Sequence, residues 1–168
     1  MADLTHRQII RILDYLDGSS YVNVDVPPHT PFLVDSTMAS IGLVPITAEQ
    51  NPEAYITQIG LHLNSLLEAP GSTPDQRRTA TQIISAMDNI NQWLVQLRQD
   101  AKQLVKLSND QLQSNSAHTL LNDMVTQANN AFVGVTDPTT GATQQGAVWV
   151  QHMMQTLAVI DIDTNPAS

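Results

Sequence analysis

Three histidines are the residues of this chain whose placement best suits metal binding. His62, His118 and His152 each flank an apolar stripe in a different stretch with helical spacing. Neutral imidazole is a common ligand of zinc and related metals, so three rings converging from separate helices would form a metal or ligand site. Histidines at the edge of a stripe are more often boundary residues with a half-packed ring. We therefore keep this site as an alternative.

The sequence contains none of the common catalytic motifs. A di-metal bundle needs Glu-x-x-His pairs, but Glu49, Glu53 and Glu68 have no histidine three residues later. There is no Gly-x-Ser-x-Gly nucleophile elbow and no glycine-rich phosphate loop. Asp161 and Asp163 lie close together, but in a stretch that we expect to be exposed, where nothing raises a carboxyl pKa. We expect no catalytic residue and no cofactor, and the sequence favours a protein that is not an enzyme.

Four methionines suggest a different alternative, a pocket for an apolar ligand. Their unbranched, polarizable side chains adapt to irregular shapes, although in helical bundles they more often fill the core. The four are Met87, Met124, Met153 and Met154. The alternative function is therefore a helical bundle that binds a small ligand or a metal through core methionines and histidines.

Charge is scarce in this chain and mostly negative. Seven Lys and Arg stand against sixteen Asp and Glu, which gives a net charge of −9, and only 14% of residues are charged. A negative field repels phosphate backbones and anionic lipids, so we expect no nucleic-acid and no membrane partner. Uncharged polar side chains lose less free energy on desolvation than charged ones, which favours a surface that binds protein.

Length and the distribution of apolar residues bound the class of protein. A chain of 168 residues suits one domain, residues 1–168, with a sizeable core and no need for disulfides, and it contains no cysteine. No apolar run approaches the ~20 residues that span a bilayer. The first residues include an acid and no apolar segment, which does not predict a secretory signal. We expect a cytoplasmic protein.

Apolar residues recur at helical spacing in five stretches. The clearest begins with a capping box and proline at Thr73 to Gln76, and its apolar seam continues through Leu94 to Leu107. The others run from Leu4 to Asp17, from Asn51 to about Pro70, from a cap at Ser108 or Ser116 through Ala131, and from the turn 136–142 through Leu157. We predict an all-α fold, an antiparallel bundle of four or five helices that is elongated along its longest helix.

Residues 19–50 form a long crossover between the first two helices, and it is too apolar to be an ordinary loop. Valines alternate with polar residues over Tyr21 to Val26, which predicts a half-buried extended segment. Residues 159–163 alternate in the same way. We propose that the two segments pair, although fraying of the last helix explains 159–163 equally well.

Six apolar residues of this crossover are the predicted partner-binding surface: Val22, Val24, Val26, Phe32, Leu33 and Val34. Either the segment folds back and covers its own bundle, or it reaches a partner, and a homodimer with exchanged arms is slightly favoured. The predicted function is a non-catalytic assembly or adaptor protein that binds itself as a homodimer or binds another protein.

Overall fold

Residues 2–160 form five α-helices and one β-hairpin in the computed structural model, which describes no residue outside that range. The helices are α1 (Ala2–Asp17), α2 (Tyr55–Glu68), α3 (Pro74–Leu104), α4 (Asn115–Val133) and α5 (Ala147–Ile160). Strands β1 (Gly134–Thr136) and β2 (Thr143–Gln145) and the 3₁₀ turns η1 (Val22–Val24) and η2 (Gln111–Gln113) complete the chain. Helix makes up 62% of the chain, which confirms the mainly helical class. None of the described helices is both long enough and apolar enough to cross a membrane.

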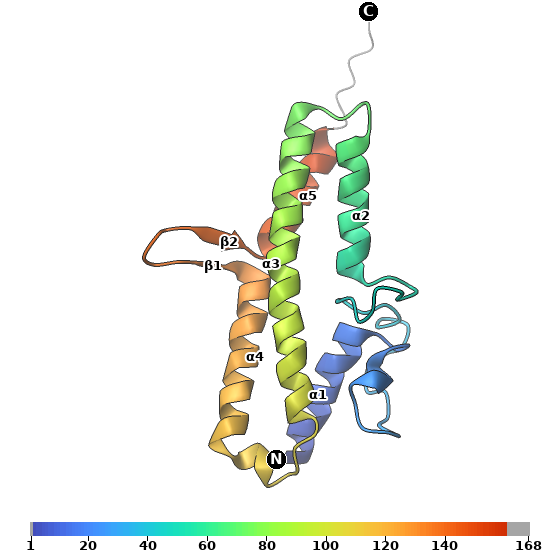
Figure 1. Cartoon of the computed structure of the whole chain (residues 1–168), viewed down its shortest axis with the longest axis vertical. Coiled ribbons are helices and arrows are strands. Elements are labelled where there is room, and N and C mark those ends of the chain that lie inside the picture. The colour runs from blue at the N-terminus through green and yellow to red at the C-terminus, as the bar shows by residue number, and fades with distance from the viewer. Residues whose placement is uncertain (1, 161–168) are drawn as a thin grey trace, which may run out of the picture.

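Helix α3 is the axis of the molecule. Its 31 residues span roughly 46 Å and pack against each of the other four helices. The predicted capping box forms: the Gln76 backbone N–H donates to the Thr73 hydroxyl (3.2 Å), and the Thr73 N–H donates to the Gln76 side-chain oxygen (2.8 Å). The helix ends at Leu104, slightly before the predicted Leu107. The long α3 makes the molecule elongated, as predicted (Figure 1).

The other helices flank α3 in two sets instead of forming one bundle. Helices α1 and α4 lie beside its lower half in Figure 1, and α2 and α5 lie beside its upper half. Because these helices have only 14 to 19 residues, each covers about half of α3. The prediction of a single antiparallel bundle of four or five helices is therefore not confirmed.

Two hydrophobic cores lie along α3, one for each set of helices. The lower core consists of Ile9, Leu13, Leu16, Val22, Val26, Val44, Leu97, Ala101, Leu104, Val105, Leu112, Ala117 and Met124. The upper core consists of Leu63, Ala80, Ile83, Ala86, Met87, Ile90, Ala131 and Val150. Two half-buried residues, Ile56 and Leu94, pack against both cores. The two cores therefore meet near the middle of α3.

The crossover folds back on its own subunit, and its predicted extended conformation is wrong. The 3₁₀ turn η1 replaces it, because the Asp25 and Val26 N–H groups both donate to the Val22 carbonyl (2.9 and 3.1 Å). Backbone groups that are bonded locally in this way are not free to pair with another strand. On the other side, α5 continues to Ile160, and residues 161–163 lie outside the described residues.

Two glycines allow the crossover to approach the end of α1. A Cβ atom on Gly42 would lie 2.5 Å from the Asp17 carbonyl carbon, and one on Gly18 would lie 2.5 Å from the Gly42 nitrogen. Next to this contact, the Leu43 and Val44 N–H groups donate to carbonyls of the last turn of α1, at 3.2 and 3.1 Å. Backbone therefore packs directly on backbone here.

Gly42→Ala should lower the free energy of unfolding by roughly 1–3 kcal/mol, because the added methyl group overlaps backbone that has no room to move. Gly60→Ala is the matched control. Gly60 lies inside α2 with nothing within 4 Å of its added Cβ, so alanine should stabilise the helix by up to about 1 kcal/mol. Urea denaturation measures both changes. Equal effects of the two substitutions would contradict the close approach.

The β-hairpin stands out from the middle of the molecule (Figure 1). Residues 137–142 form its turn, within the 136–142 turn that the sequence predicts, and Gly134 pairs with Gln145 in antiparallel register. The Asp137 carboxylate accepts the Thr139 and Thr140 N–H groups (2.7 and 3.3 Å), and these bonds hold the pKa of Asp137 below its usual range. The two short strands were not anticipated, because their alternation is too short to detect.

Candidate functional site

An apolar groove of about 670 Å³, called here the α2–α5 groove, opens beside the middle of α3. Its floor is α3, through Met87, Ile90 and Leu94. Its sides are Tyr55, Ile56 and Ile59 of α2, Ala128, Ala131 and Phe132 of α4, Ala147, Val150, Gln151, Met154 and Gln155 of α5, and Leu43 of the crossover. The groove therefore draws on four helices and is built around α3.

The packing of the helices and the size of the side chains leave this space open. Helices α2 and α5 both pack on α3, but they are not among the closely packed helix pairs of the described residues. The walls carry small side chains at Ala128, Ala131 and Ala147, where a leucine or isoleucine would reach further across. The space between α2 and α5 is therefore not filled by their side chains.

Large apolar side chains of the groove are exposed to solvent. Phe132 is 62% exposed, Tyr55 41% and Met154 40%. Among the described residues, no charged one lines the groove, and its polar side-chain groups are the Tyr55 hydroxyl and the amides of Gln151 and Gln155. An exposed apolar surface with few polar groups is typical of a site that binds another molecule.

Comparison of the chain with protein-family models, curated proteins and solved structures finds no match. The function therefore has to be inferred from the geometry and chemistry of the chain itself.

The groove brings together two of the four methionines that the sequence suggested for a pocket. Met87 lies in its floor and Met154 in its wall. Met153 packs beside the upper core, and Met124 is buried in the lower core. Methionine content predicted a pliable apolar site but not its walls, because the contributions of Tyr55 and Phe132 depend on how the helices pack.

The three histidines do not form a metal site. His62, His118 and His152 are exposed on α2, α4 and α5 respectively. Within residues 2–160, no group of three or more His, Cys, Asp or Glu side chains is placed to hold a metal ion. The rings therefore lie on the surface, as stripe-edge histidines usually do.

The six crossover residues predicted to bind a partner do not form one exposed surface. Val22 and Val26 are buried in the lower core, and Phe32 packs against it. Leu33 and Val34 are half-buried, and the Leu33 N–H donates to the buried Asp14 carboxylate (2.9 Å). Val24 alone is exposed, at 70%. Most of the apolar side chains in this set are therefore used within the subunit.

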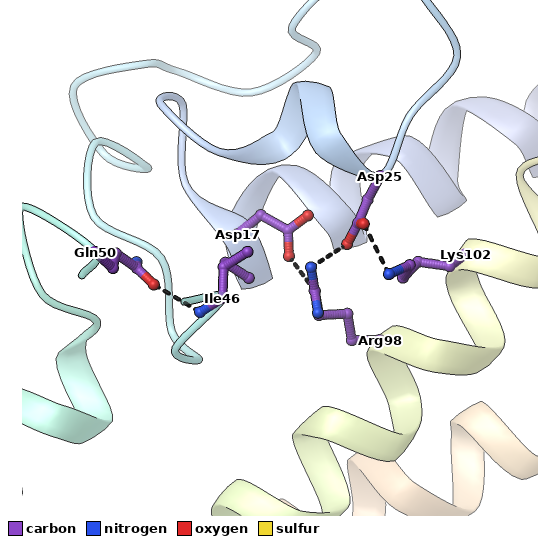
Figure 2. Close-up of polar contacts among 6 residues, drawn as sticks. All are labelled: Asp17, Asp25, Ile46, Gln50, Arg98 and Lys102. Atoms are coloured by element: carbon purple, nitrogen blue, oxygen red, sulfur yellow. Dashed lines mark hydrogen bonds and ion pairs between the residues drawn. The ribbon is translucent and has the colours of Figure 1, made fainter. Parts of the chain in front are cut away.

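A buried cluster of four charged residues, called here the charge cluster, joins the crossover to α1 and α3 (Figure 2). Arg98 of α3 donates from Nε to Asp17 Oδ1 (2.7 Å) and pairs through Nη2 with Asp25 of the crossover. Lys102 Nζ lies 2.9 Å from Asp25 Oδ1. The Asp17 and Asp25 side chains have no exposed surface, and Arg98 has 9%. None of the four residues lines the α2–α5 groove.

Burial strongly changes the acidity of Asp17. Desolvation raises the pKa of Asp17 to about 7, with attraction to Arg98 opposing the change and repulsion from Asp25 adding to it. Asp17 Oδ2 has no hydrogen-bond partner among the described residues, so it gains nothing that would stabilise a second negative charge beside Asp25. Through Arg98, the cluster connects the crossover to α1 and α3.

Sequence reasoning missed the charge cluster. Arg98 and Lys102 are spaced i, i+4 next to the apolar seam, which places two cations together on one face of α3. This spacing is the feature of the sequence that could have indicated the charge cluster. The carboxylates come from α1 and from a loop, and Asp17 is 81 residues from Arg98, so no local pattern connects them.

Proposed function

We propose that the protein is a non-catalytic binding module, an adaptor or assembly protein, that holds an apolar helical segment of a partner in the α2–α5 groove. One observation carries the proposal. The groove has a volume of about 670 Å³ and is lined, within residues 2–160, by no charged side chain, while its large apolar groups Tyr55, Phe132 and Met154 remain exposed. Burying them against a partner would be favourable at roughly 25 cal/mol per Å².

A helix fits this groove better than an extended segment does. Met87, Ile90 and Leu94 form a stripe with spacings of three and four along α3, about 10 Å long, which matches two turns of a helix. A helix laid between α2 and α5 would add a fourth member to the three helices there. Its apolar residues at i, i+3 or i+4, and i+7 would enter the groove.

A small apolar ligand is the second candidate occupant. The volume of about 670 Å³ lies within the roughly 300–1,000 Å³ that is usual for ligand sites, and Met87 and Met154 can adapt to a ligand's shape. The exposure of Phe132, at 62%, favours the helix, because a typical small-molecule site encloses most of its ligand.

Phe132→Ser should weaken binding of a labelled amphipathic peptide by tenfold or more, because exposed aromatic residues in grooves commonly contribute about 2 kcal/mol to binding. The probe is a designed helix of about 14 residues with leucine along one face. Fluorescence anisotropy measures the affinity. Leu61→Ser is the matched control, since Leu61 is 52% exposed on α2 and does not line the groove.

Equal binding by the two variants, or no binding by the unaltered protein, would refute the helix-binding function. Native mass spectrometry that shows a small molecule bound to the purified protein, together with no peptide binding, would favour the second candidate.

A further inference from the structure

We infer that the partner helix is cationic, with its apolar face in the α2–α5 groove and lysine or arginine residues along its flanks. This inference rests on the proposed function and specifies the chemistry of the partner. The observation behind it is the distribution of charge around the groove.

The three helices that form the walls contain none of the seven Lys and Arg residues of the chain. Helices α2, α4 and α5 have no Lys or Arg, and α5 has no charged residue of either sign. The whole chain has a net charge of −9. A partner helix that approaches these walls therefore meets a negative field without local positive charge to oppose it.

The basic residues of the chain are concentrated elsewhere. Arg98 and Lys102 belong to the buried charge cluster. At the start of α3, Arg78 pairs with Asp75 (2.8 Å) and Arg77 donates to the Ala69 carbonyl (3.1 Å). Arg7, Arg11 and Lys106 lie in α1 and just after α3, in the lower half of the molecule.

Two exposed acidic residues, Glu49 and Glu53, lie in the segment that leads into α2. Glu53 is two residues before Tyr55, a groove residue, and Glu49 precedes it in the same segment. The Gln58 side chain donates to the Glu53 carbonyl (2.6 Å), which fixes this segment against the first turn of α2. Basic residues at one end of the bound helix would therefore approach a segment that carries two negative charges.

The same charges disfavour two other occupants. A second copy of this chain also has a net charge of −9, so long-range repulsion opposes its approach. The segment 161–168 of the chain, Asp-Ile-Asp-Thr-Asn-Pro-Ala-Ser, has two acids and a single large apolar residue, Ile162. It lacks the repeated apolar residues that a helix in this groove needs.

The test compares three designed helical peptides with the same leucine face and with lysine, glutamine or glutamate on the flanks. We expect the lysine peptide to bind about tenfold more tightly than the glutamine peptide at low salt, and the glutamate peptide to bind most weakly. The preference should shrink as salt screens the charges. Phe132→Ser should still abolish most binding of the lysine peptide, because its apolar contact is lost.

Two double variants show which acidic residues attract the lysine peptide. Glu49→Gln with Glu53→Gln should weaken binding of the lysine peptide about two- to fivefold. Asp3→Asn with Asp110→Asn removes the same charge from exposed sites in the lower half of the molecule and should have less effect.

The possible results separate this inference from the proposed function. Equal affinity of the three peptides, or lysine-peptide binding that survives Phe132→Ser, overturns the cationic partner. In the first case the helix-binding function still stands. Failure of all three peptides to bind overturns both. A dimer in sedimentation velocity that the peptide dissociates assigns the groove to a second copy and overturns the cationic partner as well.

Discussion

Arg98→Met should lower the free energy of unfolding by about 3–5 kcal/mol, because it leaves two buried carboxylates without their main counter-ion. Arg98 contacts both Asp17 and Asp25, whose side chains have no exposed surface. Methionine has a similar length and keeps the apolar packing along α3. The loss of stability therefore reflects mainly the missing charge of the guanidinium group. Lys102 still pairs with Asp25, but Asp17 retains no cation. Chemical denaturation at pH 8, where Asp17 is mostly ionised, measures the change.

Arg78→Met is the matched control for this substitution. Arg78 pairs with Asp75 at 2.8 Å on the surface of the same helix, with 67% of its side chain exposed, so its loss should change stability by less than about 1 kcal/mol. Adding Asp17→Asn to Arg98→Met should recover part of the lost stability, because it removes the buried charge that is left without a cation. A loss below about 1 kcal/mol for Arg98→Met would show that the charge cluster does not hold the crossover.

Stability should increase by roughly 2–3 kcal/mol as the pH is lowered from 8 to 5, through the protonation of Asp17. Burial raises the pKa of Asp17 to about 7 from an ordinary value of 3.8. Between these two values the folded protein binds the proton and the unfolded chain does not, so lowering the pH favours the folded state. Above pH 7 the folded protein must hold Asp17 ionised beside Asp25, and this part of the stability is lost.

Asp17→Asn isolates the contribution of this residue. The amide cannot titrate, so the increase in stability between pH 8 and pH 5 should shrink by about 2 kcal/mol in the variant. Burial also raises the pKa of Asp14 and of Asp100, which changes stability in the same direction and remains in the variant. Thermal melts of both proteins across this range provide the measurement. Parallel curves for the two proteins would contradict the assignment to Asp17.

The sequence predicted the elements whose signals are local. The capping box at Thr73 and Gln76 identified the start of α3, and the seam through Ala80, Ile83 and Met87 identified its buried face. Both features depend on residues within a few turns of each other. Each is therefore visible without knowledge of the rest of the fold.

The arrangement of these elements could not be predicted from periodicity. Leu94 continues the seam, but it is only half-buried, because α2 and α5 separate and leave the groove above it. The alternation of Val22, Val24 and Val26 matched a strand, but the local bonds of a 3₁₀ turn and the ion pairs of Asp25 determine the conformation instead. Contacts between distant segments contribute to both outcomes, and in the second they act together with local hydrogen bonds.

Helix α3 is shared between two cores, so its two halves should be able to unfold separately. A helix of this length needs tertiary contacts along its whole surface to remain formed, and each core supports only one half of it. We therefore expect amide hydrogen exchange to resolve two cooperative units, with separate opening free energies for the two halves. Ile56 and Leu94 belong to both cores and also line the groove. A ligand that contacts these two side chains would slow exchange in both halves together and join the two units into one.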